Sequence, residues 1–307
     1  MNDYLLSVLL GIIEGLTEFL PVSSTAHLRI AESFLGVDLA NGYWKMFSIV
    51  IQLGAILCLP VYFAHRIDKL IGIRTGEHNF LVANFLRLWK TLVAVFQKGP
   101  VQLVAMAFVC TAIPAFLLTK TIGKHLESLY VMAWALVLGG IVMWLVDGIY
   151  ERSQHRAFAR GKLTEDMEEM TVGQAIWIGL CQVLSAVFPG TSRSMSTITA
   201  GELAGMSRPA ALEFSFFLSM PTMVAATVYD LFRSMRPHHG EPSAIGTMPS
   251  DAHSWIVLAI GFVVSFLVAY GVVAWFMNWV RTRGFTVFAV YRILLGALVL
   301  WYAGHPH

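Results

Sequence analysis

The chain has 307 residues, of which 57% are hydrophobic and 13% are charged, and its formal net charge is +2. Soluble domains carry about 25% charged residues. Several apolar stretches here approach or exceed about 18 residues, which is long enough to cross a bilayer core. The composition therefore predicts an all-α, polytopic membrane protein. It also excludes a nucleic-acid partner, because the few basic residues lie mostly between the expected spans.

The three cysteines, Cys58, Cys110 and Cys181, each lie in an apolar stretch. Their spacing fits neither a disulfide framework nor a zinc pattern. We expect them to be small buried hydrophobic residues.

The first expected element is a helical hairpin over about 3–36. A helix over 3–20 should end near Pro21, which cannot continue it. The next helix, about 24–36, is too short to span a bilayer. Two short helices joined by a turn indicate a re-entrant hairpin that enters and leaves the membrane on one side. Such backbone is tolerated at membrane depth only where protein or a wet cavity surrounds it.

Three longer apolar helices should follow, at about 43–64, 101–119 and 129–149. The basic connector 65–100 contains a segment, Phe80 to Phe96, that is typical of an amphipathic interfacial helix. The most polar part of the chain, 150–171, predicts a solvated linker at the midpoint of the protein.

The second half repeats the order of the first. Gly11 to Ser24 aligns with Gly179 to Ser192, and the Gly, Leu, Pro and final Ser positions coincide. The expected elements of this half are a hairpin over about 172–205, with helices at 172–188 and 192–205, and spans near 209–231, 253–278 and 284–303.

A hairpin plus three spans is an odd number of crossings, so the second repeat must be inverted. In such architectures paired broken helices meet near the midplane and build a site. We therefore expect a single integral membrane domain over 1–307, made of a first repeat over 1–149 and an inverted repeat over 172–303.

The distribution of Lys and Arg predicts the orientation. One side collects the basic residues of 65–100 and 150–171 together with Arg281 and Arg283, whereas the opposite loops hold only Lys120, Lys124, Arg233 and Arg236. The positive-inside rule places the 150–171 linker in the cytoplasm and both termini outside.

Two carboxylates, Glu14 and Glu18, lie four residues apart on one face of the first hairpin. A buried ionisable group in a membrane is costly and by default marks a functional site. Like charges repel, and a hard divalent cation such as Mg²⁺ is a natural partner because it favours carboxylate and phosphate oxygens. The alternative is a pair of protonated glutamates that pack helices.

The second hairpin carries the stretch from Pro189 to Thr197. Small residues, hydroxyls and backbone N–H groups before a helix suit an oxyanion, and Arg193 adds a planar fork suited to phosphate. An ion pair of Arg193 with Glu14 or Glu18 is the alternative, and an empty site can hold that pair until substrate arrives. The residues expected to bind substrate are Ser23, Thr25, Gly190, Thr191, Ser192, Arg193, Ser194 and Thr197.

His27 is the only histidine in either hairpin. It can serve as general acid–base or as a nucleophile, and a purely structural histidine is the alternative. Ser24 can be a nucleophile, a phosphate ligand or a turn residue. The residues expected to be catalytic are Glu14, Glu18, Ser24, His27 and Arg193, gathered in one site within the membrane.

Other polar residues within spans are weaker candidates. Gln52 and Glu213 follow the two hairpins at similar positions and either line the cavity or pack structurally. Arg292, in the last span, is expected to neutralise a carboxylate such as Glu202 or Asp147.

The two motifs resemble those of the undecaprenyl-diphosphate phosphatase family, the bacitracin-resistance type of bacterial membrane lipid phosphatase. The resemblance covers nearly the whole chain, with Ala26 and Met195 standing where the family often has glycine. It implies hydrolysis of undecaprenyl diphosphate to the monophosphate and inorganic phosphate in the bacterial inner membrane, which recycles the carrier for cell-wall synthesis and gives bacitracin resistance.

The resemblance also implies a divalent cation, Mg²⁺ or Ca²⁺, for which Glu14 and Glu18 are the expected ligands. It implies roles for Glu14, Glu18, Ser24, His27, Ser192, Arg193 and Thr197. The expected partners are the polyprenyl diphosphate substrate and membrane lipids, and a homodimer is left open. The competing function is a transporter or flippase of a polyprenyl phosphate lipid, because inverted repeats with broken helices are transporter architecture.

Overall fold

The computed structural model describes most of the chain. The described residues are 2–37, 42–71, 90, 93, 97, 99–122, 128–159, 163–235, 246, 248–249 and 251–304. Within them the chain is helices and turns, with one isolated β-bridge between Thr164 and Met206.

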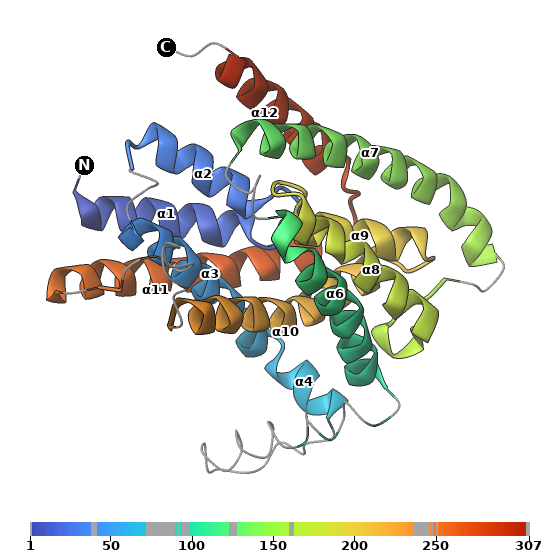
Figure 1. The fold of residues 1–307 in the computed structure, drawn as a ribbon. Helices are drawn as coiled ribbons and strands as arrows, with labels where there is room; N and C mark the ends of the chain where they lie inside the picture. Colours follow the sequence, from blue (N-terminus) through green and yellow to red (C-terminus); the bar gives the residue numbers. More distant parts are fainter. Residues whose placement is uncertain are drawn as a thin grey trace.

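The described elements of the chain are almost all helices (Figure 1). In chain order they are α1 (Asp3–Thr17), α2 (Ser24–Phe34), α3 (Gly42–Tyr62), α4 (Ala64–Leu70), α6 (Pro100–Ile122), α7 (Leu129–Ala159), the 3-10 helix η1 (Met167–Glu169), α8 (Val172–Val187), α9 (Arg193–Leu203), α10 (Arg208–Met235), α11 (Ala252–Trp279) and α12 (Thr286–Gly304).

In the described part of the chain, six helices are long and apolar enough to cross a membrane. They are Gly42–Tyr62, Pro100–Leu118, Leu129–Arg152, Arg208–Tyr229, Ala252–Trp279 and Thr286–Gly304. Each matches a predicted span to within a few residues. The prediction of an all-α polytopic membrane protein is therefore confirmed.

The four remaining longer helices form the two predicted short-helix pairs, α1 with α2 and α8 with α9. Asn2 caps α1 by accepting from the Tyr4 backbone N–H, and Thr171 begins α8 with a capping box that includes Gln174. Both first helices end a few residues before a proline, because proline has no N–H to continue the hydrogen-bond ladder.

Each of these pairs packs against the other half of the chain. Helix α1 lies along α11, α8 lies along α6, and α12 lies along α7 (Figure 1). The pairing is thus reciprocal, as expected if the halves are related by symmetry. The inversion of the second repeat stays a prediction.

Helix α7 continues to Ala159, well into the segment 150–171 that was predicted to be a solvated linker. The solvated character of 150–171 stays a prediction, and the structure adds that this segment is helical as far as Ala159, which its charged residues did not indicate. The predicted interfacial helix from Phe80 to Phe96 lies largely outside the described residues.

Arg66 of α4, which lies outside the six apolar helices, connects the first half of the chain with the second. It donates to Glu168 with distances of 2.8 and 2.7 Å and to Glu213 of α10 at 2.7 Å. Partial burial opposes ionisation of Glu168, but the hydrogen bonds and charge of Arg66 outweigh it and hold the pKa of this carboxyl below its ordinary value.

Candidate active site

Both hairpin turns end in a serine with left-handed backbone. The φ angles are 73° at Ser23 and 72° at Ser192, values that residues other than glycine rarely adopt. Strain of this kind tends to occur at functional sites. It turns the chain sharply, so that α2 and α9 begin directly beside the ends of α1 and α8.

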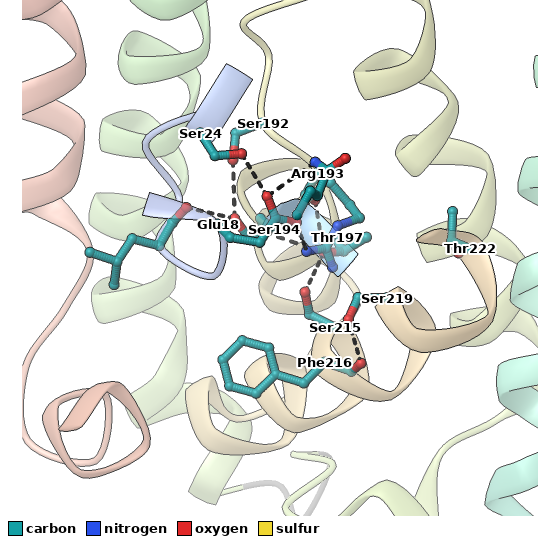
Figure 2. Close-up of polar contacts among 12 residues, drawn as sticks. Glu18, Ser24, Ser192, Arg193, Ser194, Thr197, Ser215, Phe216, Ser219 and Thr222 are labelled. Atoms are coloured by element: carbon teal, nitrogen blue, oxygen red, sulfur yellow. Dashed lines mark hydrogen bonds and ion pairs between the residues drawn. The ribbon is translucent and has the colours of Figure 1, made fainter. Parts of the chain in front are cut away.

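The two sequence motifs meet at the carboxylate of Glu18 (Figure 2). Its Oε2 accepts a hydrogen bond from Ser24 Oγ at 2.6 Å and a longer one from Gln52 Nε2 at 3.4 Å. Its Oε1 accepts from Arg193 Nη2 at 3.0 Å. The ion pair that the sequence allowed is therefore formed, and Arg193 pairs with Glu18 of the opposite half.

Arg193 retains donor capacity. Its Nη1 is buried and has no hydrogen-bond partner among the described residues. It is the first residue of α9, where the Met195 and Ser196 N–H groups donate to Ser192, and the N–H groups of Arg193 and Ser194 remain for another acceptor. The start of α9 therefore offers several unused donors beside Glu18.

The remaining hydroxyls of the second motif join the turns to their surroundings (Figure 2). Ser194 Oγ donates to the Leu20 carbonyl in the first turn at 2.8 Å and lies 3.0 Å from Ser192 Oγ. Thr197 is buried and lies 2.6 Å from Ser215 Oγ of α10. Its contacts hold α9 in position, and Thr197 does not line the cavity that Glu14 borders.

Glu14 differs from Glu18 in having no partner. It is 0% exposed, and neither of its carboxylate oxygens has a hydrogen-bond partner in the described structure. Its electrostatic neighbours are Glu18, Glu32 and Arg193, and a proton on either carboxyl would let Glu14 and Glu18 share a hydrogen bond. A buried carboxylate in this state requires a proton or a cation.

Glu14 borders a cavity of about 140 Å³ between α1, α2 and α3, which has room for several water molecules. Its lining consists of Glu14, Thr25, Leu28, Arg29, Glu32, Lys45, Ser48, Ile49 and Gln52. Among the predicted residues it thus includes Glu14, Thr25 and Gln52.

Four polar residues of the cavity lining were not predicted from the sequence, namely Arg29, Glu32, Lys45 and Ser48. Glu32 is only 1% exposed and accepts hydrogen bonds from Ser48 Oγ at 2.6 Å and Arg29 Nη1 at 3.3 Å. The signal was available for Glu32, because it is a carboxylate inside a predicted membrane hairpin, as Glu14 and Glu18 are.

A divalent cation fits this donor set. No group of three or more His, Cys, Asp or Glu side chains suited to a metal occurs in the described ranges. Mg²⁺ commonly binds one or two carboxylates and completes its shell with water and substrate phosphates. The unpartnered oxygens of Glu14, with Glu18 one turn away, supply that kind of site.

His27 has two partners among the described residues. Its Nδ1 lies 2.7 Å from the Ser23 carbonyl, so Nδ1 carries a proton, and its Nε2 lies 2.6 Å from Tyr291 Oη. The rings of His27 and Tyr291 are nearly parallel, with an interplanar angle of 11° and centroids 5.6 Å apart. His27 therefore contacts α12, whereas Ser24, at the start of the same helix α2, contacts Glu18.

Gly190 and Thr191 shape the second turn. Gly190 has a φ of 92°, and a Cβ atom here would lie 2.7 Å from the Met132 carbonyl oxygen, so only glycine fits. The Thr191 N–H donates to the Phe188 carbonyl at 3.1 Å and closes the turn.

The prediction for Arg292 was wrong. Asp147 and Glu202 both bind Arg208, and Arg292 donates to backbone carbonyls. The reason is the position of Arg292 along α12. Asp147 accepts from the backbone N–H groups at the start of α12, and Arg292 lies further along that helix.

Of the two weaker candidates, Gln52 borders the cavity and donates to Glu18. Glu213 instead binds Arg66 and does not belong to the cavity lining.

These features define a multi-pass helical membrane protein with a buried acid, hydroxyl and arginine centre made from two short-helix hairpins. A family model described as "Bacitracin resistance protein BacA" matches residues 7–298. The chain belongs to this family.

Curated relatives extend the match over the full length. A protein of Koribacter versatilis is 61% identical over 307 residues, covering 99% of each chain. A protein of Rhizobium etli is 38% identical, covering 97% of this chain and 96% of its own, and one of Caldanaerobacter subterraneus is 38% identical, covering 95% and 93%. All three are named undecaprenyl-diphosphatase.

Proposed function

We propose that this protein hydrolyses undecaprenyl diphosphate to undecaprenyl phosphate and inorganic phosphate. The names of its relatives and its family support this activity. The reaction returns the lipid carrier to cell-wall synthesis in the bacterial inner membrane. Bacitracin resistance follows from the family description.

The observation that carries the proposal is the contact of Glu18 with both Ser24 and Arg193. The substrate has a strongly anionic head and a very apolar tail. It therefore needs an anion site that is reached from within the membrane. Arg193 brings a cation to a hydroxyl and a carboxylate at such a place.

Arg193 and the start of α9 hold the diphosphate. The unpartnered Nη1 of Arg193 and the free backbone N–H groups at this helix end are suited to phosphate oxygens. Gly190, Thr191, Ser192 and Ser194 surround the same turn. On the first hairpin, Ser23 and Thr25 flank Ser24.

The proton transfers belong to Glu18 and His27. Ser24 Oγ already donates to Glu18, so Glu18 can take its proton as the hydroxyl attacks the terminal phosphorus. Attack by water with His27 as the base is the other route. In both, the bond from the terminal phosphorus to the bridging oxygen breaks, and undecaprenyl phosphate leaves. On the Ser24 route the phosphoryl group is then on Ser24 Oγ, and attack by a water molecule breaks that bond, releases inorganic phosphate and returns the proton to Ser24.

Glu14 and Glu18 would hold a divalent cation, Mg²⁺ or Ca²⁺. When bound, it supplies charge that offsets the negative charge on the transferring and leaving phosphates. The two carboxylate oxygens of Glu14 have no hydrogen-bond partner in the described structure, which supports this role.

The test is phosphate release from a C55 or C15 prenyl diphosphate by purified protein, with and without EDTA. We expect release that requires metal and that falls by at least about 100-fold in Arg193→Ala, as when a preorganised donor to the transition state is removed. Glu18→Gln should be equally inactive. Turnover of Arg193→Ala within a few-fold of wild type would contradict the assignment.

The reciprocal packing of the hairpins across the two halves favours transport as a second candidate. Transport predicts movement of a polyprenyl phosphate across sealed vesicles without phosphate release. A folded protein that moves lipid and releases no phosphate would establish this function in place of hydrolysis.

A further inference from the structure

Arg292 lies at the junction of the two hairpin turns. Its side chain is 0% exposed. Its Nη1 donates to the Pro21 carbonyl at 3.0 Å, and its Nη2 donates to the carbonyls of Gly190 and Ala135, each at 3.1 Å. Pro21 is in the first turn, Gly190 is in the second, and Ala135 is on α7. One guanidinium therefore bonds three separate parts of the chain.

Stability alone does not explain an arginine here. Its hydrogen-bond acceptors in the described structure are neutral carbonyls, and its Nε has no partner there. A buried charge without a carboxylate is costly in a membrane, and such groups are usually functional. What the side chain supplies is geometry, because its rigid planar fork fixes several acceptors relative to one another.

The surrounding helices leave room for this side chain. A Cβ atom on Gly139 of α7 would overlap Arg292 Nη2, and one on Gly140 would lie 2.8 Å from the Ala289 carbonyl oxygen. Two successive glycines on α7 thus let the guanidinium pass between α7 and α12.

The turns that Arg292 joins carry the reacting groups. Glu18 and Ser24 flank the first turn, and Arg193 directly follows the second. The neighbouring Tyr291 bonds His27, so two successive residues of α12 contact the first hairpin.

We infer that Arg292 is a positioning residue for the reaction, which sets the spacing of the two hairpin turns and hence of Glu18 and Ser24 relative to Arg193. The inference rests on the proposed phosphatase function. Arg292 acts through the turns and contacts no reacting atom.

Arg292→Lys tests the inference because lysine keeps the charge and loses the fork. We expect a fall in kcat of about 100-fold, the effect of a displacement of about 1 Å at a reacting centre, with a smaller change in KM. Gly139→Ala keeps Arg292 but displaces its guanidinium, so it should lower kcat in the same direction. Both proteins are checked for folding by size-exclusion chromatography and thermal unfolding.

Arg208→Lys is the matched control, because it makes the same substitution at another largely buried arginine, whose partners are the carboxylates of Asp147 and Glu202 and not the turns. Nitroxide labels at the exposed residues Leu16 and Phe188, in a protein without native cysteines, report the spacing between the hairpins. The distance distribution should broaden or shift in Arg292→Lys and stay unchanged in Arg208→Lys.

Wild-type kcat and an unchanged label distance in Arg292→Lys would overturn the inference. Equal losses of kcat in Arg292→Lys and Arg208→Lys, each in proportion to lost thermal stability, would also overturn it. Absence of turnover in the wild type would contradict the proposed function instead, and the label distances would still test the role of Arg292.

Discussion

Glu14 and Glu18 lie one turn apart and yet have opposite surroundings. Glu18 accepts hydrogen bonds from Ser24, Gln52 and Arg193, whereas Glu14 accepts none in the described structure. Both are almost fully buried. Glu18 therefore binds donors of the protein itself, whereas the carboxylate of Glu14 is available to a cation.

The variant Glu14→Gln separates stability from function. It replaces an unpartnered buried carboxylate by a neutral amide, so we expect an equal or higher unfolding temperature in detergent. Phosphate release should fall by about 100-fold, equivalent to about 2.7 kcal/mol of lost transition-state stabilisation. The measurements are phosphate release and thermal unfolding, each with and without Mg²⁺.

Glu18→Gln is the contrasting variant. It leaves Arg193 buried without its carboxylate, and breaking a buried pair costs about 3–5 kcal/mol.

Wild-type protein should gain thermal stability on addition of Mg²⁺, and Glu14→Gln should not. Retention of that gain in Glu14→Gln would show that Glu14 is not a metal ligand.

At the scale of elements, the broken helices depend on close contact with spans of the other half. A Cβ atom on Gly15 of α1 would lie 2.7 Å from Val268 Cβ and 2.8 Å from the Ser265 carbonyl oxygen of α11. Small residues allow such close helix packing in membranes. The position of α1 matters for the site because Glu14 belongs to it.

We therefore predict that Gly15→Ala destabilises the protein by about 1–3 kcal/mol, the usual cost of overpacking, and lowers turnover by displacing Glu14. Gly271→Ala in α11 is the control, since a Cβ atom there has no neighbour within 4 Å. It should be neutral or stabilising by up to about 1 kcal/mol, because alanine favours helix. Unfolding in one detergent compares the two, and equal stabilities would refute the packing argument.

At the scale of the molecule, contacts define two opposite ends. At one end Tyr4 of α1 lies 3.0 Å from His253 of α11, and Phe34 of α2 packs on Tyr302 of α12. Helix α4 lies at the other end (Figure 1), and its Arg66 binds Glu168. The start of α1 and the end of α12 thus lie at the same end.

We predict that the end holding the two termini faces outward. The described start of the basic connector 65–100, with Arg66 and Lys69 of α4, lies at the opposite end, which the positive-inside rule places in the cytoplasm. In a cysteine-free protein, Ala252→Cys should react with an impermeant maleimide in intact cells, and Glu165→Cys should react only after permeabilisation. The reverse labelling would invert the orientation.

Much of the fold and part of the site could be predicted because they depend on contiguous stretches of chain. A run of apolar residues long enough to cross a bilayer defines each span, and Pro21 and Pro189 mark the hairpin turns. Charged and hydroxyl side chains inside membrane segments pointed to Glu14, Glu18, Ser24 and Arg193. Polarity did not reveal where α7 ends, since a solvated segment can also be helical.

The sequence by itself determined which segments enter the membrane and which residue types the site contains, because hydropathy and helix-breaking are local properties. Only the tertiary structure decided the partners. Arg193 pairs with Glu18 while Glu14 stays unpaired, and Glu32 joins the cavity wall. Arg292 binds the carbonyls of both turns instead of a carboxylate. Backbone carbonyls are the same in every residue, so no sequence pattern distinguishes those that a buried arginine will meet once distant helices pack together.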